Sequence, residues 1–183
     1  MDTMMADFDL PDSMHLRPTR RPVVNTADFR SAMSSMASSV CVVTARRGDE
    51  QVGRTVTAVL SLSANPPSVL VSIDMMSRLA DIIAKTGGFS LAVLADGQSD
   101  IADAFAGKVP ADLRFALGEW SEWPSHHPKL SGAVSVLDCE VIGSIETGSH
   151  VLFAGAIVDT ESEDNREPLL WQRHGYHGLS DID

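Results

Sequence analysis

Apolar side chains in residues 26–37 recur at helical spacing, whereas the residues before them show no periodicity. Thr26 can cap a helix and Asp28 suits its first turn, so this stretch predicts an amphipathic helix of about three turns. Residues 1–25 mix methionine, aspartate, proline and arginine, and their prolines interrupt any helix. We therefore expect them to form an N-terminal tail or arm.

Runs with strand character fill much of the remaining chain. Segments 40–45 and 51–57 are rich in β-branched residues and flank the turn-forming segment 46–50, which predicts a hairpin. In segment 134–142 apolar and polar residues alternate, which predicts a strand with one face exposed to water. Further strands are expected at 60–63, 68–73, 89–94 and 150–158.

Short helices and a long loop are expected between these strands. Capping residues predict helices that begin near Ser77, Ser99 and Asp112, and the proline- and tryptophan-bearing stretch 118–132 is expected to be a loop. About six or seven strands connected mostly as hairpins predict a mainly β chain, an antiparallel barrel with helices at its rim. A doubly wound parallel fold is the alternative, but it needs longer helices between most strands.

Composition and charge narrow the function classes. With 183 residues, 44% of them hydrophobic and 21% charged, the chain fits one globular domain. Fourteen basic against 25 acidic side chains give a net charge of −11, which argues against nucleic acid or an anionic membrane as the main partner. Because no apolar run has the length of a signal-peptide core or a membrane span, we expect a cytoplasmic protein.

Sequence motifs for metal or nucleophile chemistry are missing. Cys41 and Cys139 each stand in an apolar run without CxxC spacing, so we expect them to be buried and unbridged. Histidines are paired at 126–127 and spaced by three at 174 and 177, but without the carboxylates and cysteines of a known metal pattern. The glycine-rich dinucleotide and P-loop motifs, HExxH and GxSxG are also missing. Without these motifs, the remaining possibility for catalysis is a reaction whose chemistry is carried out by a bound cofactor.

Seven or more short motifs, in one order, resemble the flavin reductase-like domain family. They are FRSAM at 29–33, VCVVT at 40–44, GRTVTAVLSLS at 53–63, PP at 66–67, SR at 77–78, FSLAVL at 89–94, FAG at 105–107, LDC at 137–139, GSH at 148–150 and RHGY at 173–176. The resemblance covers about residues 26–178. It therefore divides the chain into a tail at 1–25, one domain at 26–178 and a C-terminal tail at 179–183.

The resemblance implies a homodimeric split β-barrel that binds FMN, or FAD, near the subunit interface and accepts a hydride from NADH or NADPH. Ser77-Arg78 begins an expected helix and could hold a phosphate, while the hydroxyl-rich segment 54–63 could line the flavin ring. The expected cofactor-binding residues are Arg54, Thr55, Val56, Thr57, Ala58, Ser61, Ser63, Ser77, Arg78, Phe105, Gly107 and Tyr176. His150 is expected to be the catalytic residue that orients the nicotinamide, and no metal is expected.

Three functions stay open at this stage. The first is a reductase that delivers reduced flavin to a separate monooxygenase, and the second is a flavoprotein that keeps its flavin and reduces another acceptor, such as a corrinoid. The third is a flavin- or haem-binding module without turnover. Departures from the family pattern, Ala58 for a common serine and Ser149 for a frequent aspartate, bear on flavin affinity and nicotinamide preference.

Overall fold

In the computed structural model of the chain, residues 19–180 are described; residues 1–18 and 181–183, which belong to the two expected tails, lie outside the described residues. The strands are β1 (Ser38–Ser39), β2 (Cys41–Arg47), β3 (Glu50–Val56), β4 (Val59–Ala64), β5 (Pro67–Asp74), β6 (Gly88–Val93), β7 (Trp120–Glu122), β8 (Pro128–Leu130), β9 (Ser135–Glu146), β10 (His150–Ser162), β11 (Leu170–Gln172) and β12 (Gly175–His177). The helical segments are α1 (Thr26–Ser34), α2 (Arg78–Thr86), α3 (Ser99–Asp103), the π-helical turn η1 (Ala104–Lys108) and the 3-10 helix η2 (Ala111–Ala116).

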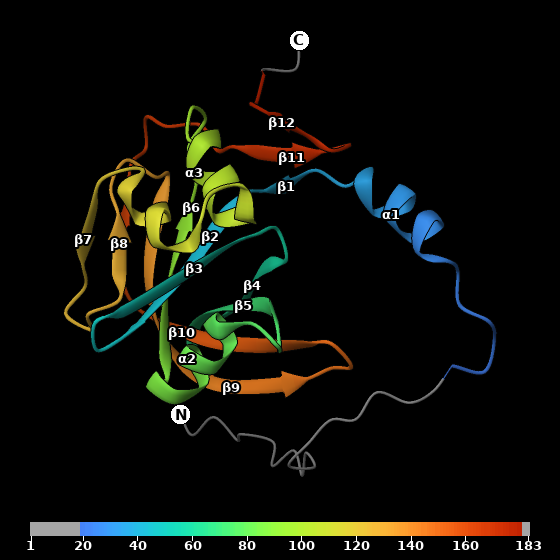
Figure 1. Cartoon of the computed structure of the whole chain (residues 1–183), viewed down its shortest axis with the longest axis horizontal. Helices are drawn as coiled ribbons and strands as arrows, with labels where there is room; N and C mark the ends of the chain where they lie inside the picture. Colours follow the sequence, from blue (N-terminus) through green and yellow to red (C-terminus); the bar gives the residue numbers. More distant parts are fainter. Residues whose placement is uncertain (1–18, 181–183) are drawn as a thin grey trace, which may run out of the picture.

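The central sheet has seven strands in the order β3-β2-β6-β9-β10-β5-β4, and every neighbouring pair is antiparallel. The expected antiparallel β-barrel with a few short helices is therefore confirmed (Figure 1). β3 and β4 are consecutive in sequence, yet they stand at opposite ends of the strand order. The barrel is split between these two strands.

Two apolar cores lie on the two faces of this sheet. The inner core packs side chains of β2, β5, β6, β9 and β10 against the buried face of α2, and both Cys41 and Cys139 belong to it as buried free thiols. The outer core covers the other face of β2, β6 and β9 with α3, η1 and the β7–β8 hairpin. Burial on both faces explains why the central strands are nearly continuous apolar runs.

The β7–β8 hairpin is the main correction to the expected fold. Residues 118–132 were expected to be a loop, but β7 and β8 pair there and pack on the outer face of the sheet. The hairpin also covers the face of β9 that was expected to be exposed to water, formed by Val136, Asp138 and Glu140. Val136 and Asp138 are buried, and only Glu140 is exposed. The hairpin also holds Asp138, because Ser125 donates a hydrogen bond to its carboxylate at 2.8 Å.

Of the four expected capping residues, Thr26, Ser77, Ser99 and Asp112, only Ser77 caps its helix; Asp112 is the second residue of η2, whose N-cap is Pro110. The Ser77 hydroxyl accepts a hydrogen bond from the Ala80 backbone N–H, so Ser77 caps α2 as predicted. α1 is capped by Asn25 rather than Thr26, since the Asn25 side chain accepts from the Asp28 N–H at 2.9 Å. Ser99 is the first residue of α3, and its N-cap, Gln98, makes no side-chain capping bond.

Helix α1 lies apart from the barrel (Figure 1) and has no buried residue. Its apolar side chains Phe29 and Met33 are 54% and 46% exposed, and Met36 beyond it is 58% exposed. Most helices in a globular protein are stabilised by an apolar face packed against a neighbour. The face of α1 is unpacked in the described part of a single chain. No helix among residues 19–180 is long and apolar enough to cross a membrane.

Gly155 of β10 marks the tightest approach in the inner core. A Cβ atom there would lie 2.6 Å from the Phe89 ring and 3.0 Å from Cβ of Cys139. We predict that Gly155→Ala lowers the free energy of unfolding by about 1–3 kcal/mol, because a buried ring must shift to admit the methyl group. Urea denaturation measures the change. Gly143→Ala on β9 is the matched control, since its Cβ would meet no atom within 4 Å; equal losses in both variants would contradict this account.

Candidate functional site

A small hollow at the split brings together several residues that the sequence assigned to cofactor binding. We call it the aromatic pocket; its volume is about 150 Å³ and it is lined by Val40, Thr55, Val56, Thr57, Ala106, Trp171 and Tyr176. The end of β3 forms one wall, and Trp171 and Tyr176 of the C-terminal strands form another. The two aromatic rings pack edge to face at 4.9 Å. The pocket therefore offers an apolar surface next to threonine hydroxyls and main chain.

Hydrogen bonds fix both walls of the aromatic pocket. Thr55 donates its hydroxyl hydrogen to the carbonyl oxygen of Ala102 at 2.6 Å, which ties β3 to α3. Tyr176 donates to the carboxylate of Asp103 at 2.7 Å, and Lys108 holds the same carboxylate at 2.8 Å. Partial burial, followed by the Asp103 hydrogen bond, raises the pKa of Tyr176 to about 12. Tyr176 is therefore a neutral, fixed phenol at neutral pH.

The second hollow, the arginine cleft, lies on the neighbouring part of β3. Its volume is about 330 Å³, and it is lined by Glu50, Gln51, Val52, Gly53, Arg54, Ser77, Arg78, Leu79, Ala111, Arg114 and Phe115. It collects three guanidinium groups beside the start of α2, whose N-terminal dipole also favours anions. Arg54 and Thr55 are consecutive on β3, so the cleft and the aromatic pocket both border this edge strand. Within this pair of hollows the structure unites Arg54–Thr57, Ser77, Arg78 and Tyr176.

Other expected site residues lie outside both hollows. His150 is exposed at the start of β10, opposite Asp74, and its Nδ1 shares a 2.8 Å hydrogen bond with the Ser149 hydroxyl. Ala58 follows Thr57 in the link to β4, and its carbonyl accepts from the Ser72 N–H. Ser61 and Ser63 lie on β4, where both are exposed. The hydroxyl-rich segment 54–63 thus consists of the end of β3, a two-residue link and most of β4.

Phe105 and Gly107 line neither hollow. The Phe105 ring is fully buried and contacts Phe115 and Trp120 edge to face or at a tilt. A Cβ at Gly53 would lie 2.7 Å from this ring, so Phe105 supports the middle of β3 from below. Gly107 has a φ of 103°, a backbone conformation that favours glycine, where η1 turns away from α3.

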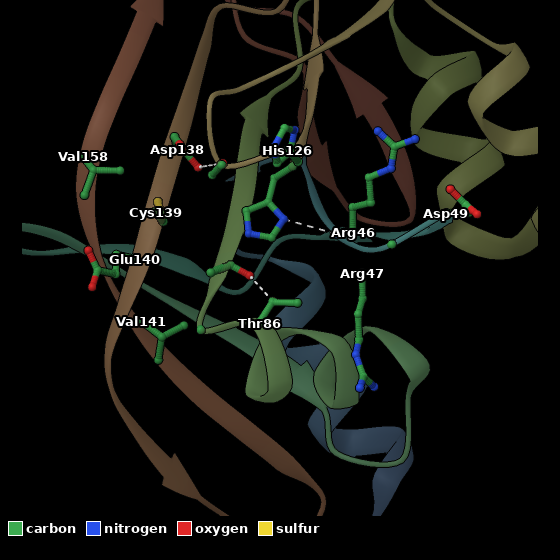
Figure 2. Close-up of a pocket in the computed structure, with 15 residues that line it drawn as sticks. Arg46, Arg47, Asp49, Thr86, His126, Asp138, Cys139, Glu140, Val141 and Val158 are labelled. Carbon is green, nitrogen blue, oxygen red and sulfur yellow. Dashed lines mark hydrogen bonds between the residues drawn. The ribbon is translucent and has the colours of Figure 1, made fainter.

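A larger hollow lies elsewhere, and the sequence did not predict it. We call it the histidine pocket; it measures about 920 Å³ and is lined by Arg46, Arg47, Gly48, Asp49, Thr86, Gly87, Gly88, Ser125, His126, His127, Asp138, Cys139, Glu140, Val141 and Val158 (Figure 2). His127 is buried there, and its Nδ1 accepts a hydrogen bond from the Arg46 N–H at 3.2 Å. No group of three potential metal ligands occurs within residues 19–180. The adjacent histidines at 126–127 are visible in the sequence, but a pair of histidines does not by itself predict a cavity.

Comparison with known proteins places the chain in a family. The family described as "Flavin reductase like domain" matches residues 33–180. The chain is 31% identical over 159 residues to the FMN reductase (NADH) RutF of Stutzerimonas stutzeri, covering 87% of this chain and 91% of the relative. It is 33% identical over 155 residues to the reductase component of an FADH(2)-dependent resorcinol hydroxylase from a Rhizobium species, covering 84% and 87%.

A solved structure agrees with these sequence relatives. The NADH:FAD oxidoreductase SgcE6 of Streptomyces globisporus, in complex with NAD and FAD fragments, superposes with a TM-score of 0.80 at 26% identity, covering 89% of this chain and all of that chain. With a split barrel, a family match over most of its length and this structural likeness, the chain belongs to the flavin reductase-like family. The resemblance stated from the sequence motifs is confirmed.

The buried imidazole of the histidine pocket predicts a pH dependence of stability. Burial lowers the pKa of His127, and the opposing attraction of Asp138 is smaller. The unfolded chain, with a histidine pKa of about 6.5, therefore binds the proton first as the pH falls. The contribution of the neutral His127 to stability is fully present above about pH 6.5. It is lost progressively as the pH falls from there to the lowered pKa of the folded state.

We predict that the melting temperature of the wild type falls between pH 7 and pH 5 more steeply than that of His127→Gln. Differential scanning calorimetry at several pH values makes the measurement. The control is His174→Gln, an exposed histidine outside the histidine pocket, which should keep the steep decline of the wild type. Parallel profiles for the wild type and His127→Gln would contradict the assignment.

Proposed function

We propose that this chain is an NAD(P)H-dependent flavin reductase that supplies reduced flavin to a partner monooxygenase in the cytoplasm. The observation that carries the proposal is that the aromatic pocket and the arginine cleft both border β3, in a chain of the flavin reductase-like family. The reductase component of a resorcinol hydroxylase among its relatives supports a two-component system. Free, buried cysteines fit a reducing compartment.

The residues present fit a flavin nucleotide. An isoalloxazine ring needs an apolar wall, which Val56, Ala106 and Trp171 provide, and main-chain groups along its polar edge, which Thr57, directly after β3, provides. A flavin phosphate needs cations and N–H donors, which Arg54, Arg78 and the start of α2 provide. A bound flavin supplies the acceptor, its N5, for the hydride from C4 of the nicotinamide.

The chain contributes binding and orientation rather than acid–base catalysis. Tyr176 and Trp171 hold one face of the pocket rigid, since their rings pack together and the phenol is bonded to Asp103. His150 stands at the beginning of β10 with its Nδ1 bonded to Ser149, which leaves Nε2 to hydrogen-bond a nicotinamide amide. Correct distance and angle between donor and acceptor can account for a large rate enhancement.

The proposal includes a homodimer. α1 presents an unpacked apolar face with Phe29 and Met33, and the edge strand β4 presents Leu60 and Leu62, which are 50% and 46% exposed. An exposed apolar helix and an unpaired sheet edge both favour association. A second copy of the chain would cover these surfaces and place flavin near the interface.

The direct experiment is to add NADH anaerobically to purified protein with FMN or FAD and to follow the flavin absorbance. We expect the absorbance to bleach, with turnover when oxygen is admitted. Protein that binds flavin without bleaching would favour a binding module. Flavin that stays bound through gel filtration would favour a flavoprotein that reduces another acceptor. Protein that neither binds nor reduces either flavin would remove the proposal.

We predict that His150→Ala lowers kcat/KM for NADH by about tenfold while the Kd for FMN changes less than twofold, because the imidazole orients the nicotinamide and not the flavin. Stopped-flow reduction and flavin fluorescence titration measure the two quantities. His126→Ala, at the distant histidine pocket, is the control and should leave both unchanged. A His150→Ala enzyme with wild-type kinetics at every NADH concentration would count against this role.

We also predict that Met33→Glu converts the dimer to a monomer, since a carboxylate on the apolar face of α1 cannot be buried without a large cost. Sedimentation velocity measures the mass of the particle. Arg30→Glu, on the same helix, is the control for a change of charge at an exposed position that is not apolar. A wild type that sediments as a monomer at all concentrations would contradict the expected dimer.

A further inference from the structure

The guanidinium of Arg78, expected to bind the flavin phosphate, is already bound by a carboxylate of the chain. Arg78 Nε donates to Oε1 of Glu50 at 2.8 Å, and its Nη2 contacts Oε2 of the same residue. Two parallel N–H···O bonds are also the arrangement by which arginine binds a phosphate. The Glu50 carboxylate therefore occupies the N–H groups of Arg78 that a phosphate would use.

The arginine cleft has more positive than negative groups. Arg54 and Arg114 line it together with Arg78, while Glu50 is the acidic side chain among its lining residues. Arg54 makes no ion pair within residues 19–180, and Arg114 uses its Nε on the Val109 carbonyl. The chain as a whole carries a net charge of −11. A local excess of guanidinium groups in such a chain indicates an anion as the ligand.

Neighbouring charges hold Arg78 at the mouth of the cleft when Glu50 leaves. Asp81, one turn into α2, contacts Nη1 of Arg78 and also binds Lys85. The hydrogen bond from Arg78 lowers the pKa of Glu50, so Glu50 is ionised at neutral pH. Glu50 takes the Nε and Nη2 groups of the guanidinium, and Asp81 takes Nη1. A phosphate can therefore form two parallel bonds to Arg78 only when Glu50 leaves, since a third anion would also repel the two carboxylates.

We propose that Glu50 competes with the flavin phosphate for Arg78 and so keeps flavin binding weak and reversible. The inference rests on the proposed function and adds its regulation. The Glu50 side chain is free to move aside, since the side chains of Glu50 and Arg78 are 46% and 48% exposed and Glu50 begins β3 directly after the Gly48-Asp49 turn. A loosely held flavin suits an enzyme that passes reduced flavin to a partner.

The experiment compares Glu50→Gln with the wild type by fluorescence titration with FMN and with riboflavin, which has no phosphate. We expect the Kd for FMN to fall about fivefold at low ionic strength and the Kd for riboflavin to stay unchanged, because an exposed ion pair is of modest strength and is screened by salt. Glu122→Gln is the matched control: it also removes an exposed glutamate from an arginine, Arg46, but at the histidine pocket. It should leave both Kd values unchanged.

Two further measurements make the outcome decisive. In Glu50→Gln/Arg78→Gln the gain in FMN affinity should vanish, and inorganic pyrophosphate should raise the melting temperature of Glu50→Gln more than that of the wild type. Equal tightening for riboflavin, or an FMN affinity that Glu50→Gln leaves unchanged or lowers, would overturn the competition while the proposed function stands. A wild type that binds neither flavin would remove the proposed function and this inference together.

Discussion

The split between β3 and β4 is the constraint on which the candidate site depends. These strands are joined by Thr57 and Ala58, but they close opposite ends of the seven-stranded sheet and exchange no ladder hydrogen bonds. Main-chain groups at a sheet edge remain available to a ligand or a second chain. The aromatic pocket and the arginine cleft both open along β3, so the gap in the barrel supplies the binding surface.

The rigidity of β3 comes from the layer packed behind it. Phe105 fills the space against Gly53, and Thr55 is bonded to α3, so the strand cannot shift without breaking buried contacts. Farther along the sheet, buried or partly buried hydrogen bonds join the β7–β8 hairpin to the strands, among them Thr44 to the Pro128 carbonyl, Trp123 to Ser90, and Ser125 to Asp138. These bonds satisfy polar groups that would otherwise be costly to bury.

Charge is distributed unevenly over the surface of the chain. The acidic chain as a whole disfavours polyanions, yet the arginine cleft gathers three guanidinium groups at one end of β3. An isolated cationic cleft on an acidic protein selects small anions over extended ones, because the surrounding carboxylates repel a long negative chain. This distribution fits a mononucleotide or dinucleotide ligand and fits the family to which the chain belongs.

The sequence alone determined the seven strands of the central sheet, the α2 helix with its Ser77 cap, and the family, because β-branched runs, caps and ordered motifs act over a few residues. It failed for the β7–β8 hairpin, since short strands carry little local signal, and for Asp138, whose polarity suggested exposure. The tertiary structure alone decided that Glu50 meets Arg78, 28 residues away in sequence, and that His127 is buried. Such contacts depend on how distant segments pack, which no local pattern encodes.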